Sequence, residues 1–263
     1  MNGEAALRFG VFCGLLAVIA LWEASAPRRA DPPDRRRRWP ANLAFAVLGT
    51  IVSRLVLPGG LAAFAAAGEV RGWGLLGAVA LPGWAGFALS LVLLDLAIYF
   101  QHRIFHRVPL LWALHRMHHS DTMFDVSTAV RFHPAEIAIS LAIKAGVVAL
   151  VGAPPEAVLA FEILLNATSL FNHANARMPA AAEGFVRLFV VTPDMHRIHH
   201  SARREETDSN FGFCVPWWDR LFGTYTARPA DGQEGLVIGL ETFRDRESQR
   251  LVRLLVQPFA RPQ

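Results

Sequence analysis

The histidines constrain this chain more than any other residue type. All ten lie between positions 102 and 200, and eight of them form three tight clusters. These clusters are His102-x-x-x-His106, His115-x-x-His118-His119 and His196-x-x-His199-His200, while His133 and His173 lie between the second and the third. Because 53% of the chain is hydrophobic, so many imidazoles have little structural use. Neutral imidazole is the commonest metal ligand in proteins, so the pattern predicts metal binding.

The composition around the histidines indicates a membrane protein. Only 18% of the 263 residues are charged, and apolar stretches occur at about 8–24, 42–66, 74–100, 135–152 and 155–172. Crossing a bilayer takes about 20 apolar residues, so the last two stretches could form a short hairpin that enters the membrane without fully crossing twice. The sequence therefore predicts an all-α fold, an integral-membrane helical bundle of four to five membrane segments with a cytoplasmic helical cap that carries the histidines.

The arginines predict the orientation of the first stretch. Arginines at 28–29 and 35–38 follow it, whereas only Arg8 lies near its start. The positive-inside rule then places the N-terminus outside and the loop after the stretch in the cytoplasm. Ala-Ser-Ala at 24–26 resembles a signal-peptide cleavage site, but Pro27 disfavours cleavage, so we interpret the stretch as a retained anchor. Counting spans places all three histidine clusters on the cytoplasmic side, and the compact, arginine-rich chain suggests a bacterial inner membrane.

Helical spacing brings the histidines of each cluster onto one face, because residues three and four apart are neighbours on a helix. Asp95 and Tyr99 extend the stripe of the first cluster into the preceding apolar stretch. Pro193 and Asp194 suit the start of the helix that carries the third cluster. A ligating histidine usually donates its second N–H to a nearby acceptor. Asp95, Asp194 and Asn172 are our main candidates for contacting the ligands, although Asp95 could instead form a helix-packing hydrogen bond.

Several residues between the clusters are further candidates for the site. His133 and His173 each flank an apolar stretch, and we predict that both are metal ligands or contact the ligands. Carboxylates that could accept from a ligating histidine are Asp121, Asp125, Glu136 and Asp219.

The number of histidines favours two metal ions over one. A zinc ion takes four protein ligands at most in typical sites, so eight to ten imidazoles suit two ions with four or five each. The sequence lacks a Glu-x-x-His pair, so the carboxylate di-iron bundle plan does not apply, and it lacks an H-E-x-x-H motif, which argues against a zincin-type protease. The arginines form no nucleic-acid-binding motif. Two alternatives to an oxidative enzyme stay open at this point, a zinc-dependent membrane hydrolase and a non-catalytic membrane metal carrier.

The order of the motifs resembles a known family. The segments that carry the resemblance are Tyr99-Phe100-Gln101-His102-Arg103, Leu111-Trp112…His115-Arg116-Met117-His118-His119, Arg131-Phe132-His133-Pro134, Asn172-His173-Ala174-Asn175, His196-Arg197-Ile198-His199-His200 and Asn210-Phe211-Gly212…Trp218-Asp219. Together they resemble the fatty acid hydroxylase/sterol desaturase superfamily of integral-membrane di-iron oxygenases. The resemblance implies two Fe ions held by the ten histidines, although purified protein could carry Zn instead. It also implies O2 as co-substrate and hydroxylation or desaturation of a lipid C–H bond, for example in a fatty acyl chain or a sterol.

The resemblance also predicts how the chain is divided. We expect membrane segments over 1–94, the catalytic domain over 95–226 and an amphipathic tail over 227–263. The tail predicts a helix over 241–257 that lies on the membrane surface or packs against the cap. No cytochrome b5-like His-Pro-Gly-Gly segment and no G-x-G-x-x-G fingerprint occurs in the sequence. Electrons for the implied reaction would therefore come from a separate protein, namely a ferredoxin, a cytochrome b5-like protein or a reductase.

Overall fold

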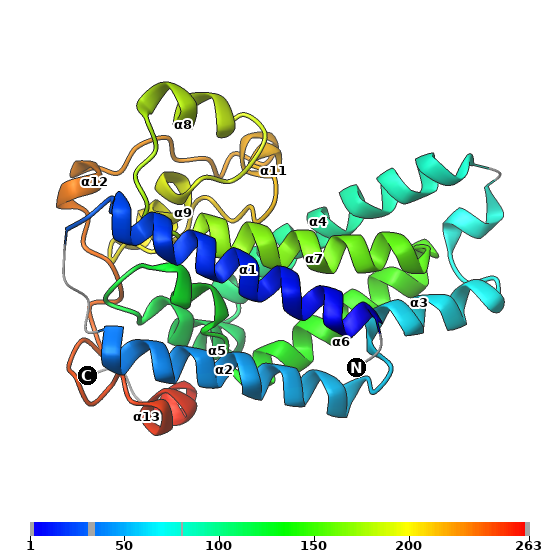
Figure 1. Ribbon diagram of the computed structural model, residues 1–263, viewed down its shortest axis with the longest axis horizontal. Coiled ribbons are helices and arrows are strands. Elements are labelled where there is room, and N and C mark those ends of the chain that lie inside the picture. Colours follow the sequence, from blue (N-terminus) through cyan, green and yellow to red (C-terminus); the bar gives the residue numbers. More distant parts are fainter. Residues whose placement is uncertain (1–2, 31–34, 80, 261–263) are drawn as a thin grey trace.

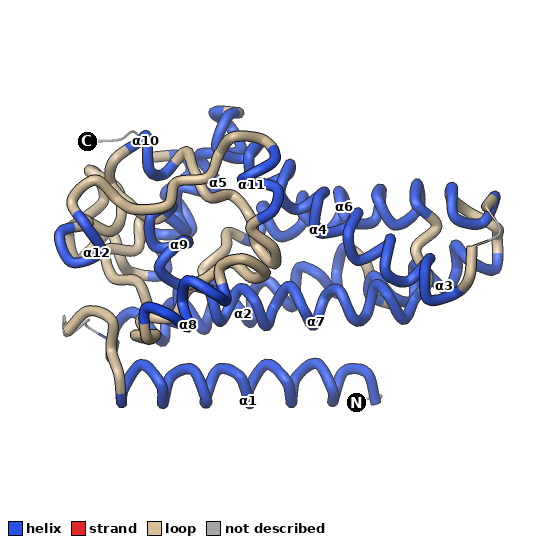
Figure 2. Tube along the Cα trace, turned by 90° about the horizontal axis from the view of Figure 1, so that it is seen from above, coloured by secondary structure: helices blue, strands red, loops and turns tan. Residues whose placement is uncertain are grey.

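The protein is an elongated, helical molecule with two dissimilar ends. The computed structural model describes residues 3–30, 35–79 and 81–260. Over those residues no β-strand is present, and extended backbone pairs only at two isolated bridges, Pro27 with Ala176 and Ser201 with Ile238. Long helices form a bundle at one end, and short helices with long loops form a cap at the other (Figure 1; Figure 2 gives the view at 90°). The all-α fold predicted from the sequence is confirmed.

The bundle contains the long apolar helices. They are α1 (Gly3–Ser25), α2 (Arg35–Val56), α3 (Gly60–Val70), α4 (Gly83–Arg107), α6 (Pro134–Val151) and α7 (Pro155–Asn172), with the 3-10 helix η1 (Leu75–Ala78) between α3 and α4. Among the described residues, four stretches are long and apolar enough to cross a membrane, namely Gly3–Ser25, Arg35–Ala78, Gly83–Arg107 and Pro134–Val151. The α7 helix is not one of these four, and it packs against α1, α3 and α4 inside the bundle. The chain is therefore an integral membrane protein.

Two of the expected apolar stretches are divided differently in the structure. The stretch at 42–66 is not one helix, because α2 ends at Val56 and α3 begins at Gly60, after a turn that contains Pro58. Proline lacks the N–H that would continue the hydrogen-bond ladder, so the helix stops before it. The stretch at 74–100 begins with the 3-10 helix η1 and becomes α-helical only at Gly83. The arginines at 35–38, which we expected in a loop, form the first turn of α2.

The α6 and α7 helices are joined by a tight turn at 152–154, and two glycines fix this turn to the rest of the bundle. Gly152 ends α6 with a left-handed φ of 73°. A Cβ on Gly152 would lie 2.4 Å from the carbonyl oxygen of Trp73, and one on Gly74 would lie 2.0 Å from the amide nitrogen of Gly152. Only glycine permits such a close approach of two backbones. The connection between α3 and α4 is therefore seated directly on the turn between α6 and α7.

The cap is made of short helices, of which α5 and η2 lie between α4 and α6 in the sequence and the others follow α7. They are α5 (Pro109–His119), η2 (Val126–Val130), α8 (Ala180–Val186), α9 (Pro193–His199), α10 (Arg204–Thr207), α11 (Trp217–Leu221), α12 (Gly232–Gly235), α13 (Leu251–Val256) and η3 (Gln257–Phe259). The prediction of a helix over 241–257 is wrong about its length, because only Leu251–Val256 is α-helical in this range. Its Leu254 is buried against Phe45 and Met117. The tail thus packs against the protein, as one of the two alternatives predicted.

A buried ionic network ties the start of α2 to the cap. The guanidinium of Arg38 donates to both carboxylate oxygens of Asp121 at 2.7 Å and to Asp125 at 2.9 Å. Arg38 is 4% exposed, and both carboxylates are 1% exposed or less. Breaking one member of a buried pair leaves an uncompensated charge, which typically costs about 3–5 kcal/mol. Arg38 of α2 therefore fixes the position of the loop that follows α5.

Candidate metal centre

Nine of the ten histidines come together in the cap, in two adjacent groups. The five-histidine group consists of His102, His106, His115, His119 and His199, and the four-histidine group of His118, His173, His196 and His200. Within each group the candidate ligand atoms all lie within 4.8 Å of one another. Each of these nine residues is at most 4% exposed. The groups touch, because the rings of His119 and His200 stack with centroids 4.5 Å apart.

The helical spacing explains how the histidines reach the site. His102 and His106 lie one turn apart at the end of α4, and their ring centroids are 5.1 Å apart. The α5 helix divides its cluster, so that one histidine, His118, joins the four-histidine group. The α9 helix begins as predicted at Pro193, and the Thr192 side chain caps it by accepting from the Met195 amide. The sequence predicted that the histidines of each cluster share one helix face. It did not predict that the histidines of one cluster, such as His118 and His119, would be divided between the two groups.

Six of the nine histidines are oriented by an acceptor at Nδ1. Four of these acceptors are backbone carbonyls: Phe211 for His102 (2.8 Å), Arg131 for His118 (3.3 Å), Ser169 for His173 (2.8 Å) and Ser209 for His199 (2.7 Å). The other two are carboxylates: Glu136 for His115 (2.7 Å) and Asp208 for His106 (3.4 Å). A carbonyl oxygen can only accept, so the Nδ1 atoms that face carbonyls carry the proton. In the neutral ring the Nε2 atom is then unprotonated.

The unprotonated Nε2 atoms face one another. His102 Nε2 and His199 Nε2 lie 3.0 Å apart, although both rings donate from Nδ1. The same holds for His118 Nε2 and His173 Nε2 at 3.1 Å. Two lone pairs at hydrogen-bond distance, with no proton between them, repel each other. A cation that accepts both lone pairs removes this conflict, so the tautomers fit a bound metal ion in each group.

The pKa values of the histidines in the cap agree with this assignment. Burial, reinforced in most of them by neighbouring imidazoles, lowers the pKa of His118, His119, His196 and His200 well below the usual value. Burial also lowers the pKa of His173 to about 4 and that of His199 to about 3. These rings therefore stay neutral at physiological pH, which is the state in which imidazole binds a metal. Within the described residues, His106 Nε2 and both ring nitrogens of His200 have no hydrogen-bond partner.

The acidic side chains are distributed unevenly between the groups. Glu136, in the first turn of α6, and Asp208 both contact histidines of the five-histidine group. The four-histidine group has only carbonyl acceptors among the hydrogen bonds described. A carboxylate makes the imidazole that it accepts from a stronger donor to a metal. Glu136 was among the predicted carboxylates, but Asp208 was not, because it follows the last cluster in a loop that has no periodic signal.

The three main candidates for orienting the ligands do not contact a histidine directly. The carboxylate of Asp95 accepts from the indole N–H of Trp218 at 2.8 Å and from the Cys214 amide at 3.3 Å. Asn172 donates to the Phe213 carbonyl. Asp95 and Asn172 thus fix the segment that follows Phe211, whose own carbonyl orients His102.

The remaining candidates hold loops and helices of the cap. Asp194 accepts from Arg197 at 2.5 Å within α9. Asp219 accepts from the amides of Phe211 and Gly212 at 2.8 Å each, and burial raises the pKa of its carboxyl to about 6. By accepting from these two amides, the Asp219 carboxyl also helps to fix the position of the Phe211 carbonyl, which accepts from His102.

His133 is the one histidine that the structure places outside both groups. Its Nδ1 accepts from the Ala135 amide at 3.1 Å, which caps α6, and its Nε2–H donates to the Leu255 carbonyl at 3.1 Å. Both ring nitrogens are therefore in use. His133 connects the start of α6 to the C-terminal helix α13.

Two phenylalanines separate the histidines from the core of the bundle. Phe213 lies 5.2 Å from His102 and 5.7 Å from His196 between ring centroids, so it touches both groups. Phe132 stacks on His118 at 4.4 Å. Both belong to the apolar cluster that also contains Leu94 and Phe161 of the bundle. The two histidine groups thus contact the helical bundle through these two aromatic rings.

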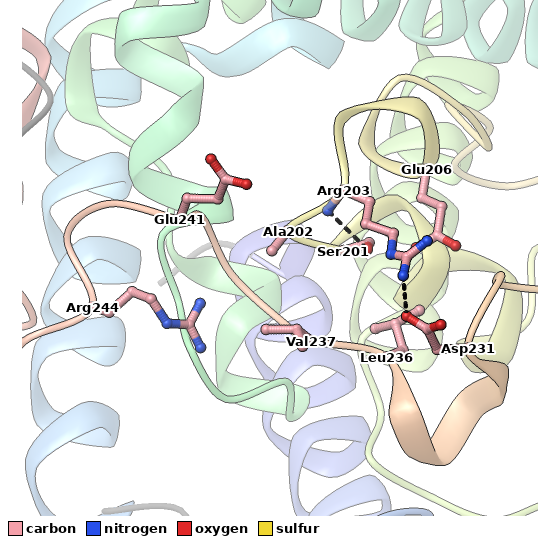
Figure 3. Close-up of a pocket in the computed structure, with 9 residues that line it drawn as sticks. All are labelled: Ser201, Ala202, Arg203, Glu206, Asp231, Leu236, Val237, Glu241 and Arg244. Atoms are coloured by element: carbon pink, nitrogen blue, oxygen red, sulfur yellow. Dashed lines mark hydrogen bonds and ion pairs between the residues drawn. The ribbon is translucent and has the colours of Figure 1, made fainter.

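A polar cavity lies beside the metal centre and not in it. Its volume is about 430 Å³, and its lining includes Ser201, Arg203, Asp231 and Arg244 (Figure 3). Both arginines in its lining have partners, because Arg203 forms an ion pair with Asp231 at 2.5 Å and Arg244 donates to backbone carbonyls. None of the nine grouped histidines lines this cavity, so it does not mark the candidate metal site.

Comparison with known proteins agrees with the site. The profile of the fatty acid hydroxylase family matches residues 87–224, which is more than half of the chain and includes all nine grouped histidines. Among curated proteins, the chain is 30% identical over 173 residues to an ornithine lipid hydroxylase of Rhizobium tropici. It is 30% identical over 156 residues to alkylglycerol monooxygenase of Homo sapiens, and 28% over 141 residues to a cholesterol 25-hydroxylase-like protein of Danio rerio.

The matches cover only part of each protein. They span 66%, 57% and 52% of this chain, and 50%, 32% and 54% of the three relatives, in the same order. The chain thus spans about half the length of these relatives or less. No solved structure matches it significantly.

Proposed function

This chain belongs to the fatty acid hydroxylase family, and on that premise we propose that it is a membrane-bound di-iron oxygenase that hydroxylates a C–H bond of a lipid. The observation that carries the proposal is the facing pair of unprotonated nitrogens, His102 Nε2 and His199 Nε2 at 3.0 Å. The same arrangement recurs in the four-histidine group. Two touching groups with this chemistry support two ions held by nine histidines, without His133.

The donor set supports iron. Every grouped side chain is an imidazole, a donor that suits iron, zinc, copper and nickel. Five donors in one group exceed the four of a typical zinc site. The three relatives are named as hydroxylases or monooxygenases, which supports oxidative chemistry over hydrolysis and hydroxylation over desaturation.

The bound ions would supply the activation of O2. The overall reaction places one oxygen atom of O2 in the C–H bond and releases the other as water, with two electrons and two protons from outside. The protein would position the substrate and exclude water from the site. Burial of all nine histidines keeps water away, and a reactive centre benefits from that exclusion.

The lipid would approach from the bundle. Phe132 and Phe213 are the apolar surface nearest to both groups, so an acyl chain or ring that displaces them would lie beside both ions. Holding the reacting carbon of the substrate close to the reactive group can supply a large part of the rate acceleration of an enzyme. We further propose that the cap faces the cytoplasm, because arginines at 28–29 and 35–38 lie at the cap end of α1 and α2.

Metal analysis tests the proposal directly. We expect protein produced in ⁵⁷Fe-enriched medium to contain close to two irons per chain, with Mössbauer spectra of a coupled pair. The His118→Ala variant should lose iron, and the His133→Asn variant should keep it. Stoichiometric zinc without iron, after iron-replete expression, would contradict the oxygenase and favour a hydrolase.

The reaction is tested by isotope labelling. Membranes that contain the protein, supplied with a reductant and ¹⁸O2, should accumulate hydroxylated lipid with the label in the new hydroxyl group. Label from water instead of O2 would exclude an oxygenase, whichever metal is bound.

A further inference from the structure

The buried metal centre approaches the protein surface at one tryptophan. Trp112, in the first turn of α5, is half-buried. Its ring centroid lies 4.9 Å from that of His106 and 5.4 Å from that of His119. Both histidines belong to the five-histidine group, and no contact of Trp112 with the four-histidine group is described. A single indole thus bridges the surface and one half of the site.

The surface around Trp112 has an apolar centre and a basic edge. Val108 is 42% exposed and Leu110 is 75% exposed, both just before Trp112 in the chain. Arg107 is exposed at the end of α4, and Arg204 is 69% exposed, where it pairs with Asp208 beside His106. Apolar anchors with charged residues at the rim are typical of a protein-binding surface. The positive rim fits an acidic partner.

This surface lies at the cap end of α4, the end of that apolar helix that carries Arg103 and Arg107. Charged side chains are costly in the hydrocarbon core of a bilayer, so this end of α4 fits the membrane–water interface, where a soluble protein can reach it.

We propose that this surface, made by Arg107, Val108, Leu110, Trp112 and Arg204, is where a small acidic one-electron carrier docks and that Trp112 conducts its electrons to the five-histidine group. The inference rests on the proposed function, which needs two electrons for each hydroxylation. Each docking event oxidises one carrier by one electron and reduces the metal centre by one, so two carriers serve one turnover. Trp112 is unchanged at the end.

Stopped-flow reduction measures this role without the lipid substrate. The iron-loaded, oxidised protein in detergent is mixed anaerobically with a reduced plant-type [2Fe–2S] ferredoxin, and the oxidation of the ferredoxin is followed. We expect Trp112→Ala to slow the reaction about 30-fold, as expected for loss of a central tryptophan anchor. Trp112→Phe keeps an aromatic ring and should lie between. Trp217→Ala is the matched control, because Trp217 is 47% exposed and no contact of its ring with a histidine is described.

Charge and membrane variants complete the test. Arg107→Glu should lower the association rate and weaken its dependence on ionic strength, whereas Leu110→Glu should lower binding of the ferredoxin to the metal-free protein. If these variants instead reduce only association with anionic vesicles and leave ferredoxin reduction unchanged, the surface binds lipid and the inference is wrong.

Dithionite separates this inference from the proposed function. We expect it to reduce the metal centre of every variant equally. Failure to reduce the parent protein with dithionite contradicts the di-iron proposal itself. Equal ferredoxin rates for Trp112→Ala and the parent, with dithionite reduction intact, overturn only the docking inference.

Discussion

Arg116 donates from its Nη2 atom to the backbone carbonyl of Gln257 at 2.6 Å, across 141 positions of the chain. The same nitrogen reaches the carbonyl of Ala260. Arg116 lies in α5 between His115 and His118, and the contacts described for its side chain are with the C-terminal segment and not with a histidine. The last described residues of the chain, beyond the family match at 87–224, therefore hold the helix that serves both groups.

Removal of this contact should loosen the metal centre. We expect Arg116→Met to lower stability by about 1.5–3 kcal/mol, the usual contribution of hydrogen bonds to a charged group, and to lower iron content. Thermal unfolding in detergent and metal analysis measure both. Arg250→Met is the control, because the ion pair of Arg250 with Glu247 is exposed and contributes little. Unchanged iron content in Arg116→Met would show that the C-terminal contact does not position α5.

Glu136 should control metal affinity in the five-histidine group. Glu136→Ala removes the acceptor of His115 Nδ1, and loss of such a contact usually costs about 10–100-fold in metal affinity. Glu136→Gln keeps an acceptor but loses the charge, so its effect should be smaller. Glu156→Ala, in the exposed first turn of α7, should bind metal like the parent. Competition with a chelator gives the affinities, and equal values for all three variants would refute the role.

His133 should behave as a cap and not as a ligand. His133→Asn keeps a side-chain acceptor for the Ala135 amide but loses the bond to Leu255. We expect a loss of about 1 kcal/mol in unfolding free energy with two irons still bound. His173→Asn is the matched comparison in a grouped histidine, and it should lose metal. Loss of iron from His133→Asn equal to that from His173→Asn would place His133 among the ligands.

The metal-free protein should lose stability as the pH falls below about 6.5, the value of an unfolded histidine. The folded pKa values of His173 and His199 are lowered to about 4 and about 3, so these rings stay neutral while the unfolded chain takes up protons. Stability is thus complete above about 6.5 and decreases towards the folded values, by about 1.4 kcal/mol per unit and histidine. Thermal unfolding at pH 7.5 and 5.5 checks the sign. A higher melting temperature at 5.5 would contradict it.

The sequence predicted the parts of this site that depend on side-chain identity and helical spacing. His102 and His106 lie on one face of α4 because i and i+4 are neighbours, and the start of α9 follows from Pro193 and its cap. The partners of the histidines were harder to predict. The carbonyls of Ser169 and Ser209 orient His173 and His199, and a carbonyl leaves no trace in the residue type.

The boundaries of some helices could not be predicted correctly from the local sequence. The residues on both sides of Pro58 are apolar, so the sequence pattern did not indicate the break between α2 and α3. The tail at 241–257 has helical periodicity, but its first part is held by tertiary contacts, such as Gln249 donating to the carbonyls of Ser120 and Phe243. His133 shows the same limit, because its partner Leu255 lies 122 positions away.

Four of the nine grouped histidines take their orientation from the main chain, at Phe211, Arg131, Ser169 and Ser209. A carbonyl persists whatever side chain its residue carries, so most substitutions at Ser169 or Ser209 leave the hydrogen bond to the ring intact. The orientation of the ligands is thus protected against mutational drift. The apolar side, where Phe132 and Phe213 face the bundle, can then change shape while the arrangement of the nine histidines is kept, so the proposed lipid specificity could change without a change in the proposed metal ligands.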